Sequence, residues 1–180
     1  MEEIRIEGEK IYLRSITIED SAQVIRWRNS DFVRQFFVIQ KDFTMDSQRR
    51  WIEEEIDKKK AVQFIIVRKQ EEKNIGSVYL RDIDEENHKA EYGVFIGERV
   101  CLGKGYGTEA AELMTEYGFD KLHLHKIFLH VLVQNERARS SYRKAGFVEE
   151  AVLRDEVCIN GVYQDMVRMA KFAESGDSNT

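Results

Sequence analysis

Three apolar segments follow one another in the middle of the chain, with only short polar stretches between them. They cover residues 63–67, 75–84 and 89–96, and each has the length and residue content of a strand. The polar stretch 85–88 joins the last two, which predicts an antiparallel hairpin. Because doubly wound dinucleotide-binding folds repeat a strand–helix–strand unit, this strand meander argues against them.

Helical patterns and further strands surround the meander. Thr17 and Asp20 have the spacing of a capping box, and Asn135 is placed to cap a later helix. The dipeptide Asn160-Gly161 is typical of a two-residue hairpin turn. The expected helices are 17–28, 44–56, 108–119 and 135–145, and the other expected strands are 10–16, 126–133, 147–158 and 162–169. We predict an α/β (α+β) fold with a mixed, mostly antiparallel sheet flanked by helices.

The length and charge of the chain limit its organisation and its partners. Its 180 residues can form a single domain, which we expect over 1–172, followed by a disordered tail at 173–180. The formal net charge of -5 argues against general nucleic-acid binding. The chain starts without a signal-peptide pattern, and no apolar run approaches membrane-spanning length. We therefore expect a cytoplasmic protein with no membrane or nucleic-acid partner.

The segment 102–108 contains three glycines that alternate with other residues, and a helical pattern follows at once. Alternating glycines allow a tight turn, and a helix N-terminus adds free N–H donors and a positive dipole end. Such a site suits a phosphate or pyrophosphate. The residues that would offer backbone N–H groups are Gly103, Lys104, Gly105, Tyr106, Gly107 and Thr108. The spacing is not that of a P-loop, and a purely structural turn stays open as an alternative.

Neither disulfide nor metal chemistry has support in the sequence. Cys101 and Cys158 are too few for a disulfide scaffold, and we expect Cys101 to be a small buried residue. His123, His125 and His130 lack Cys or acidic partners at metal-ligand spacing, so we predict no metal site.

A second motif lies in the segment 133–147. Here the sequence resembles the GNAT superfamily of N-acetyltransferases, in which a glycine loop and a later Asn-initiated helix bind acetyl-CoA. The residues that match the helix motif are Asn135, Ala138, Tyr142, Lys144, Gly146 and Phe147, and Gly105 and Gly107 match the loop. Short segments such as 90–96 are similar to the ribosomal-protein alanine and spermidine N-acetyltransferase branch. The usual leading Arg or Gln of the loop is Leu102 here, and Arg99 or Lys104 could supply the missing charge.

The resemblance implies direct acetyl transfer from acetyl-CoA to a primary amine, with acetyl-CoA as a co-substrate. Asn135 and Arg137 would join the glycine loop in binding the cofactor. A backbone N–H of Phe95 or Ile96 would polarise the thioester carbonyl. Tyr142 would protonate the leaving thiolate, although core packing could also explain a tyrosine there.

An amine must lose its proton before it attacks the thioester. We expect Glu91 to accept this proton, because Glu91 lies on the strand that leads to the thioester and shares a face with Gly93 and Phe95. Asp82, Asp84 and His88 are alternatives, and Glu91 could also be an ordinary solvent-facing residue.

The acceptor is left open among protein N-termini, polyamines, amino sugars and other small amines. The segment 36–39 could line a pocket, although such an apolar run is more often core or interface. Carboxylates at 82–86 could attract a cationic acceptor, whereas Arg26, Arg28 or Arg34 could accommodate an anionic nucleotide sugar. A non-catalytic acyl-CoA-binding sensor is the alternative from another functional class, and a homodimer is compatible with the pattern.

Overall fold

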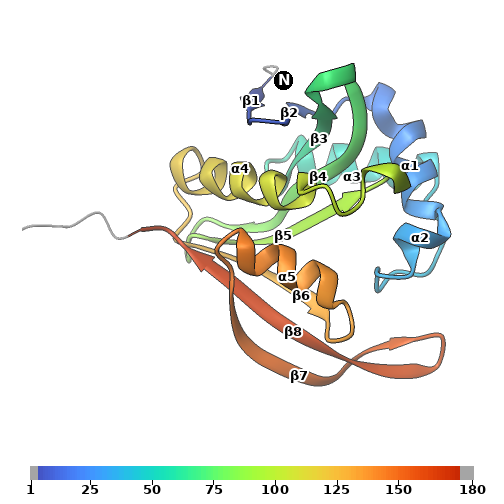
Figure 1. The fold of residues 1–180 in the computed structure, drawn as a ribbon, viewed down its shortest axis with the longest axis vertical. Coiled ribbons are helices and arrows are strands. Elements are labelled where there is room, and N and C mark those ends of the chain that lie inside the picture. The colour runs from blue at the N-terminus through green and yellow to red at the C-terminus, as the bar shows by residue number, and fades with distance from the viewer. Residues whose placement is uncertain (1–3, 175–180) are drawn as a thin grey trace, which may run out of the picture.

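The computed structural model describes residues 4–174, which form one eight-stranded sheet with helices on both faces (Figure 1). The strand order is β1-β2-β3-β4-β5-β6-β8-β7. Neighbouring strands are antiparallel except for β5 and β6, which are parallel. The strands are β1 (Arg5–Glu7), β2 (Ile11–Ser15), β3 (Val62–Arg68), β4 (Lys73–Asp84), β5 (Lys89–Ile96), β6 (Lys126–Leu132), β7 (Val148–Ile159) and β8 (Val162–Phe172). The predicted mixed, mostly antiparallel sheet flanked by helices is confirmed.

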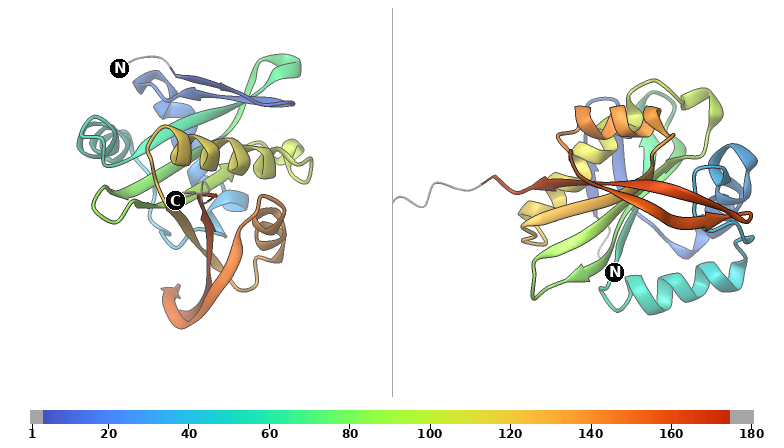
Figure 2. Two further views of the ribbon diagram at one scale, coloured as in Figure 1. Left: turned by 90° about the vertical axis from the view of Figure 1, so that its left-hand side faces the viewer. Right: turned by 90° about the horizontal axis from the view of Figure 1, so that it is seen from below.

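The helices are divided between the two faces of the sheet. The helices are α1 (Ser21–Asn29), α2 (Asp31–Arg34), α3 (Met45–Trp51), α4 (Tyr106–Asp120) and α5 (Glu136–Lys144). Seen from below, α3 and α5 lie on opposite sides of the sheet (Figure 2). Alternation along the strands provides a core for each side. On β5, Ala90 and Tyr92 join the core under α4 and α5, whereas Phe95 joins the core under α1 to α3.

Local sequence signals explain where several elements begin and turn. The carboxylate of Asp20 accepts a hydrogen bond from the Thr17 N–H at 2.9 Å, so the predicted capping box is present. The side chain of Asn135 accepts from the Ala138 N–H at 3.2 Å and begins α5 as expected. Asn160 and Gly161 both have positive φ, as a two-residue hairpin turn between β7 and β8 requires.

The structure differs from the sequence expectations at several short elements. β1 and α2 were not expected, and neither were the 3-10 segments Lys69–Glu71 and Arg99–Cys101. The expected helix 44–56 is α3 followed by a π-helical turn, Ile52–Ile56. α4 starts at Tyr106 instead of Thr108, because Gly105 in a left-handed conformation is itself the N-cap. Residues 175–180 of the expected tail lie outside the described residues.

The sheet opens between β5 and β6. These two strands pair only from Lys89–Glu91 to Lys126–Phe128, near the start of each strand. Beyond that point β5 continues beside β4, whereas β6 continues beside β8. Figure 1 shows the two strands diverging toward the end at which α5 lies. The C-terminal half of β5 therefore has a free edge inside the molecule.

Candidate active site

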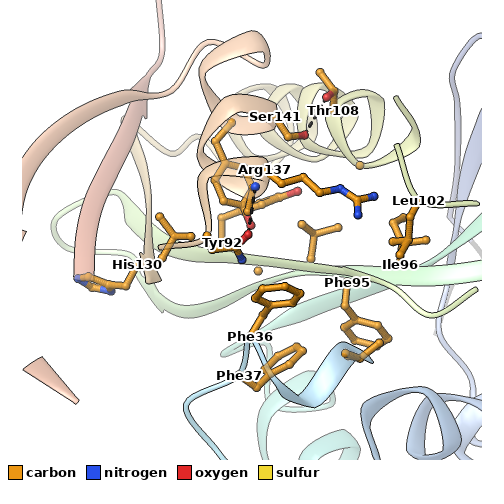
Figure 3. A pocket seen from close by; sticks show the side chains of 18 of the residues that line it. Phe36, Phe37, Tyr92, Phe95, Ile96, Leu102, Thr108, His130, Arg137 and Ser141 are labelled. Atoms are coloured by element: carbon orange, nitrogen blue, oxygen red, sulfur yellow. Dashed lines mark hydrogen bonds between the residues drawn. The ribbon is translucent and has the colours of Figure 1, made fainter. Parts of the chain in front are cut away.

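A cavity of about 740 Å³ lies where β5 and β6 separate. Its walls come from α1 and α2, from β5, from the glycine loop and the start of α4, and from β6, α5 and the β7–β8 hairpin (Figure 3). The sequence-predicted site residues that line it are Glu91, Phe95, Ile96, Gly103, Gly105, Tyr106, Gly107, Thr108, Asn135, Arg137 and Tyr142. Lys104 is exposed and does not line it. The segment 36–39 also lines the cavity, as the first of its two interpretations predicted: Phe36 and Ile39 are each 49% exposed, and Phe37 packs against the core under α1 to α3.

The glycine loop places the N-terminus of α4 at one end of the cavity. Gly103 and Gly105 have φ values of 74° and 87°, which favour glycine. A side chain at Gly105 would meet no atom of the described part of the chain within 4 Å, so a ligand can approach this backbone closely. No side chain of the described residues caps α4, and the N–H groups of its first turn are available to an anion. The hydroxyls of Thr108 and Ser141 lie 2.8 Å apart and connect α4 with α5 (Figure 3).

Arg137 supplies positive charge beside this loop. Figure 3 shows its side chain reaching from α5 toward Leu102, and its Nη2 would lie 3.9 Å from a Cβ on Gly103. Arg137 has no hydrogen-bond or ion-pair partner within residues 4–174, whereas Arg139 and Arg143 of the same helix are paired with Glu136 and Glu149. Arg137 is thus free to bind a phosphate.

The charge that Leu102 lacks was expected from Arg99 or Lys104. The structure places neither of them on the cavity: the Arg99 guanidinium lies 5.1 Å from the centre of the Phe32 ring, and Lys104 is exposed. Arg137 lies beside the loop instead, because α5 brings it back to Gly103.

The free edge of β5 presents backbone groups to the cavity. The Gly97 N–H donates to the Ile75 carbonyl at 2.8 Å, and the Phe95 carbonyl faces Gly76 of β4. Since N–H directions alternate along a strand, the Phe95 N–H also faces β4, while that of Ile96 faces the gap. Of the two predicted donors, Ile96 is the one available to a thioester. Phe95 contributes its ring to the cavity wall.

Tyr142 lies on α5 at the edge of the gap. Its ring makes edge-on contacts with Tyr92 and tilted contacts with Phe147, both with centroids 6.0 Å apart. Burial raises the pKa of Tyr142, and the neighbouring Tyr79 adds to the effect. The phenol therefore stays protonated at neutral pH. Its hydroxyl forms no hydrogen bond with the part of the chain that the structure describes, so it can donate one to a ligand.

Glu91 is held by two cationic or polar neighbours. Its Oε2 accepts from Nε and Nη2 of Arg81 at 3.0 and 2.8 Å, and its Oε1 lies 3.0 Å from Nδ1 of His130. Burial would raise the pKa of Glu91, but the bond to His130 and the charge of Arg81 outweigh it, and the net shift is downward. Glu91 is therefore ionised and accepts the Nδ1 proton of His130.

This arrangement leaves Nε2 of a neutral His130 with a free lone pair. His130 lines the cavity, although nothing in the sequence singled it out as a candidate proton acceptor and it was weighed there only as a metal ligand or an ordinary surface or strand histidine. The pairing of β5 with β6 is what brings His130 next to Glu91. Glu91 is opposite Phe128, and His130 lies two residues further along β6 on the same face.

The other sequence candidates lie elsewhere. Asp82, Asp84 and His88 do not line the cavity. Asp84 accepts from the Asn87 side chain, and Asp82 lies beside Arg81. Residues 4–174 contain no cluster of three or more His, Cys, Asp or Glu residues that could hold a metal ion. The same residues include no helix long and apolar enough to span a membrane.

The structure combines a mixed sheet that opens between two strands, a glycine loop at a helix N-terminus and a tyrosine at the edge of the gap. Residues 10–148 match the family model described as Acetyltransferase (GNAT) domain, and the chain belongs to this family. The predicted family and the predicted co-substrate, acetyl-CoA, are confirmed.

Relatives agree with this assignment. The chain is 31% identical over 167 residues to the probable N-acetyltransferase YjcK of Bacillus subtilis, and the alignment covers 89% of this chain and 92% of that protein. It is 42% identical over 95 residues to a spermidine N(1)-acetyltransferase of Vibrio cholerae, covering 53% of this chain and 54% of that protein.

Solved structures show the same fold. The crystal structure of spermidine N-acetyltransferase from Vibrio cholerae in complex with CoA and spermine superimposes with a TM-score of 0.84 at 29% identity. The superposition covers 92% of this chain and 96% of that chain. The chain is thus an acetyl-CoA-dependent N-acetyltransferase that acts on amines.

Proposed function

We propose that this enzyme transfers the acetyl group directly from acetyl-CoA to a primary amine that enters the cavity from the side of α1 and α2. The observation that carries the proposal is the gap between β5 and β6, which leaves the Ile96 N–H free between the glycine loop and Tyr142. Cys101 borders the cavity but is only 1% exposed and packs in the core, which supports direct transfer without an acyl-cysteine.

The cofactor would lie along the free edge of β5. Its pyrophosphate would accept hydrogen bonds from the first turn of α4 and from Arg137. Its pantetheine amides would pair with β5 as an added strand does. The thioester oxygen would then accept the Ile96 N–H, which stabilises the negative charge that develops during attack.

Two side chains would handle the protons. Nε2 of His130, oriented by Glu91, would take a proton from the acceptor ammonium. The neutral amine nitrogen would then bond to the thioester carbon, and the C–S bond would break as the tetrahedral intermediate collapses. Tyr142 would donate its proton to the departing thiolate, and the second proton that the acylated nitrogen loses would reprotonate the Tyr142 phenolate. Glu91 becomes a positioning residue, because the contacts with Arg81 and His130 already occupy its oxygens.

The acceptor is tested first with a panel of amines scored by release of free CoA thiol. Polyamines belong in it because relatives are named spermidine N-acetyltransferases, together with peptides that have free N-termini and with amino sugars. Thiol release with at least one amine is expected. Thermal stabilisation by acetyl-CoA and CoA, but not by ATP or NAD, is expected as well. Stabilisation by ATP or NAD alone would contradict the proposal. A cytoplasmic location and a homodimer stay predictions.

Replacing Arg137 with Gln is expected to raise the KM for acetyl-CoA about tenfold while kcat changes little. A charge-assisted hydrogen bond to a phosphate is worth about 1.5–3 kcal/mol, and most of it is made before the chemical step. Arg139→Gln is the matched control, because Arg139 lies on the same helix but is paired with Glu149. An equal rise in KM in both variants would show a general loss of charge instead of a specific contact.

A further inference from the structure

We propose that the acceptor carries an anionic group in addition to its amine, and that Arg28 of α1 binds this group. The inference rests on the proposed acetyl transfer and specifies the substrate class of the same cavity. It predicts that amines with a carboxylate or a phosphate are better substrates than neutral amines or polyamines.

Arg28 lies in the acceptor part of the cavity, surrounded by aromatic rings. Its guanidinium carbon is 3.9 Å from the centre of the Phe43 ring, 5.0 Å from that of Phe37 and 5.8 Å from that of Phe95. Burial lowers the pKa of Arg28, Tyr79 opposes this shift and Arg81 adds to it, yet a guanidinium stays charged. The rings hold the cation in place and shield it from water.

No acidic side chain of residues 4–174 neutralises Arg28. Its Nε is buried without a hydrogen-bond partner, as are those of Arg34, Arg68 and Arg168. The other three arginines each form an ion pair with a carboxylate. Arg34 pairs with Asp42 and Arg68 with Glu71, both through Nη2, and Arg168 pairs with Glu150 through Nε. Within residues 4–174, Arg28 forms no ion pair and no hydrogen bond. A largely buried charge without a counter-ion is costly, so an anion delivered by the ligand would stabilise the complex.

The position of Arg28 relative to Ile96 and His130 determines where the anionic group of the acceptor would lie. Phe95, which contacts the Arg28 guanidinium, is the neighbour of Ile96, and it shares a face of β5 with Glu91. Arg28, Glu91 and His130 all line the same cavity. An acceptor could therefore place its amine near His130 and its anionic group at Arg28.

The charges of the cavity disfavour a polyamine. Among the described lining residues, the carboxylates are those of Glu91 and Glu156. Glu91 is paired with Arg81 and His130, and Glu156 is exposed on β7. The carboxylates at 82–86, which the sequence suggested as an attraction for cations, do not line the cavity. Arg28, which pairs with no carboxylate of residues 4–174, faces the acceptor and would repel a second ammonium.

The test compares amines that differ only in the anionic group. The pairs are β-alanine with propylamine and phosphoethanolamine with ethanolamine, and spermidine is assayed beside them. We expect kcat/KM to be at least about tenfold higher for the anionic member of one pair. The pair that shows the preference distinguishes a carboxylate from a phosphate. In Arg28→Met this ratio is expected to fall to near one, and Arg28→Lys should retain part of it. Arg26→Met, an exposed arginine on the same helix, should leave the ratio unchanged.

Other outcomes separate the two proposals. Preferred turnover of spermidine, or the same ratio in Arg28→Met as in the unmodified enzyme, would overturn the role of Arg28 and leave acetyl transfer intact. If no amine releases thiol, the proposed function fails on this panel. The role of Arg28 as an anion-binding residue is then tested by ligand binding alone. Thermal stabilisation by β-alanine or phosphoethanolamine that is lost in Arg28→Met would then support the site. Its absence, in a variant still stabilised by CoA, would overturn it.

Discussion

Replacing Tyr142 with Phe is expected to lower kcat about 10²-fold while the Kd for acetyl-CoA changes little. The substitution keeps the ring that packs against Tyr92 and Phe147 and removes only the hydroxyl. Without that donor, the thiolate must leave unprotonated or wait for a proton from water, and a positioned general acid contributes roughly 10²–10⁴-fold. Steady-state kinetics and calorimetric titration with acetyl-CoA measure the two quantities separately.

Tyr117 provides the control for this experiment. Its hydroxyl lies outside the cavity, on α4, where the ring packs against Phe64 with centroids 5.2 Å apart. Tyr117→Phe should therefore retain normal kcat. Near-normal turnover in Tyr142→Phe would remove this tyrosine from the chemistry and leave it a packing role.

Replacing His130 with Ala is also expected to lower kcat about 10²-fold, because the acceptor ammonium then lacks a positioned proton acceptor. Added imidazole should restore part of the rate, since it can occupy the vacated space beside Glu91. A merely structural histidine would not give such rescue. His125→Ala is the matched control, because His125 is exposed and contacts Phe172 away from the cavity.

The variant Glu91→Gln shows whether Glu91 or His130 accepts the proton of the acceptor ammonium. If His130 accepts the proton, Glu91→Gln should lower kcat less than His130→Ala does, and imidazole should not rescue it. A larger loss in Glu91→Gln, with near-normal turnover in His130→Ala, would instead assign proton transfer to Glu91 as the sequence predicted.

Elements with strong local signals could be predicted from the sequence. β5 was expected at 89–96 and is found there, because its apolar run is bounded by a polar turn. The start of α5 and the β7–β8 turn follow from Asn135 and Asn160-Gly161, which act on neighbouring backbone. β1 and α2 have three and four residues, too few for a periodic pattern to be recognised.

Parts of the site that depend on long-range packing could not be predicted. The parallel pairing of β5 with β6 joins segments that are far apart in the chain, and it alone brings His130 to Glu91. The same applies to Arg28, whose surroundings come from β5 and from the segment after α2. Arg137 was predicted as a cofactor ligand, but its proximity to Gly103 depends on how α5 packs beside the loop.

The divergence of β5 from β6 affects the selectivity of the enzyme between acetyl-CoA and other acetyl thioesters. A slot with the hydrogen-bonding pattern of a missing strand recognises amides at regular intervals, which a flexible hydrocarbon tether does not offer. A thioester on a short or amide-free carrier would therefore dock poorly even if its acetyl group were identical. While it is bound, the acyl donor would occupy the place of an additional strand beside β5. The sheet would therefore be continuous across the gap only until the CoA thiol leaves.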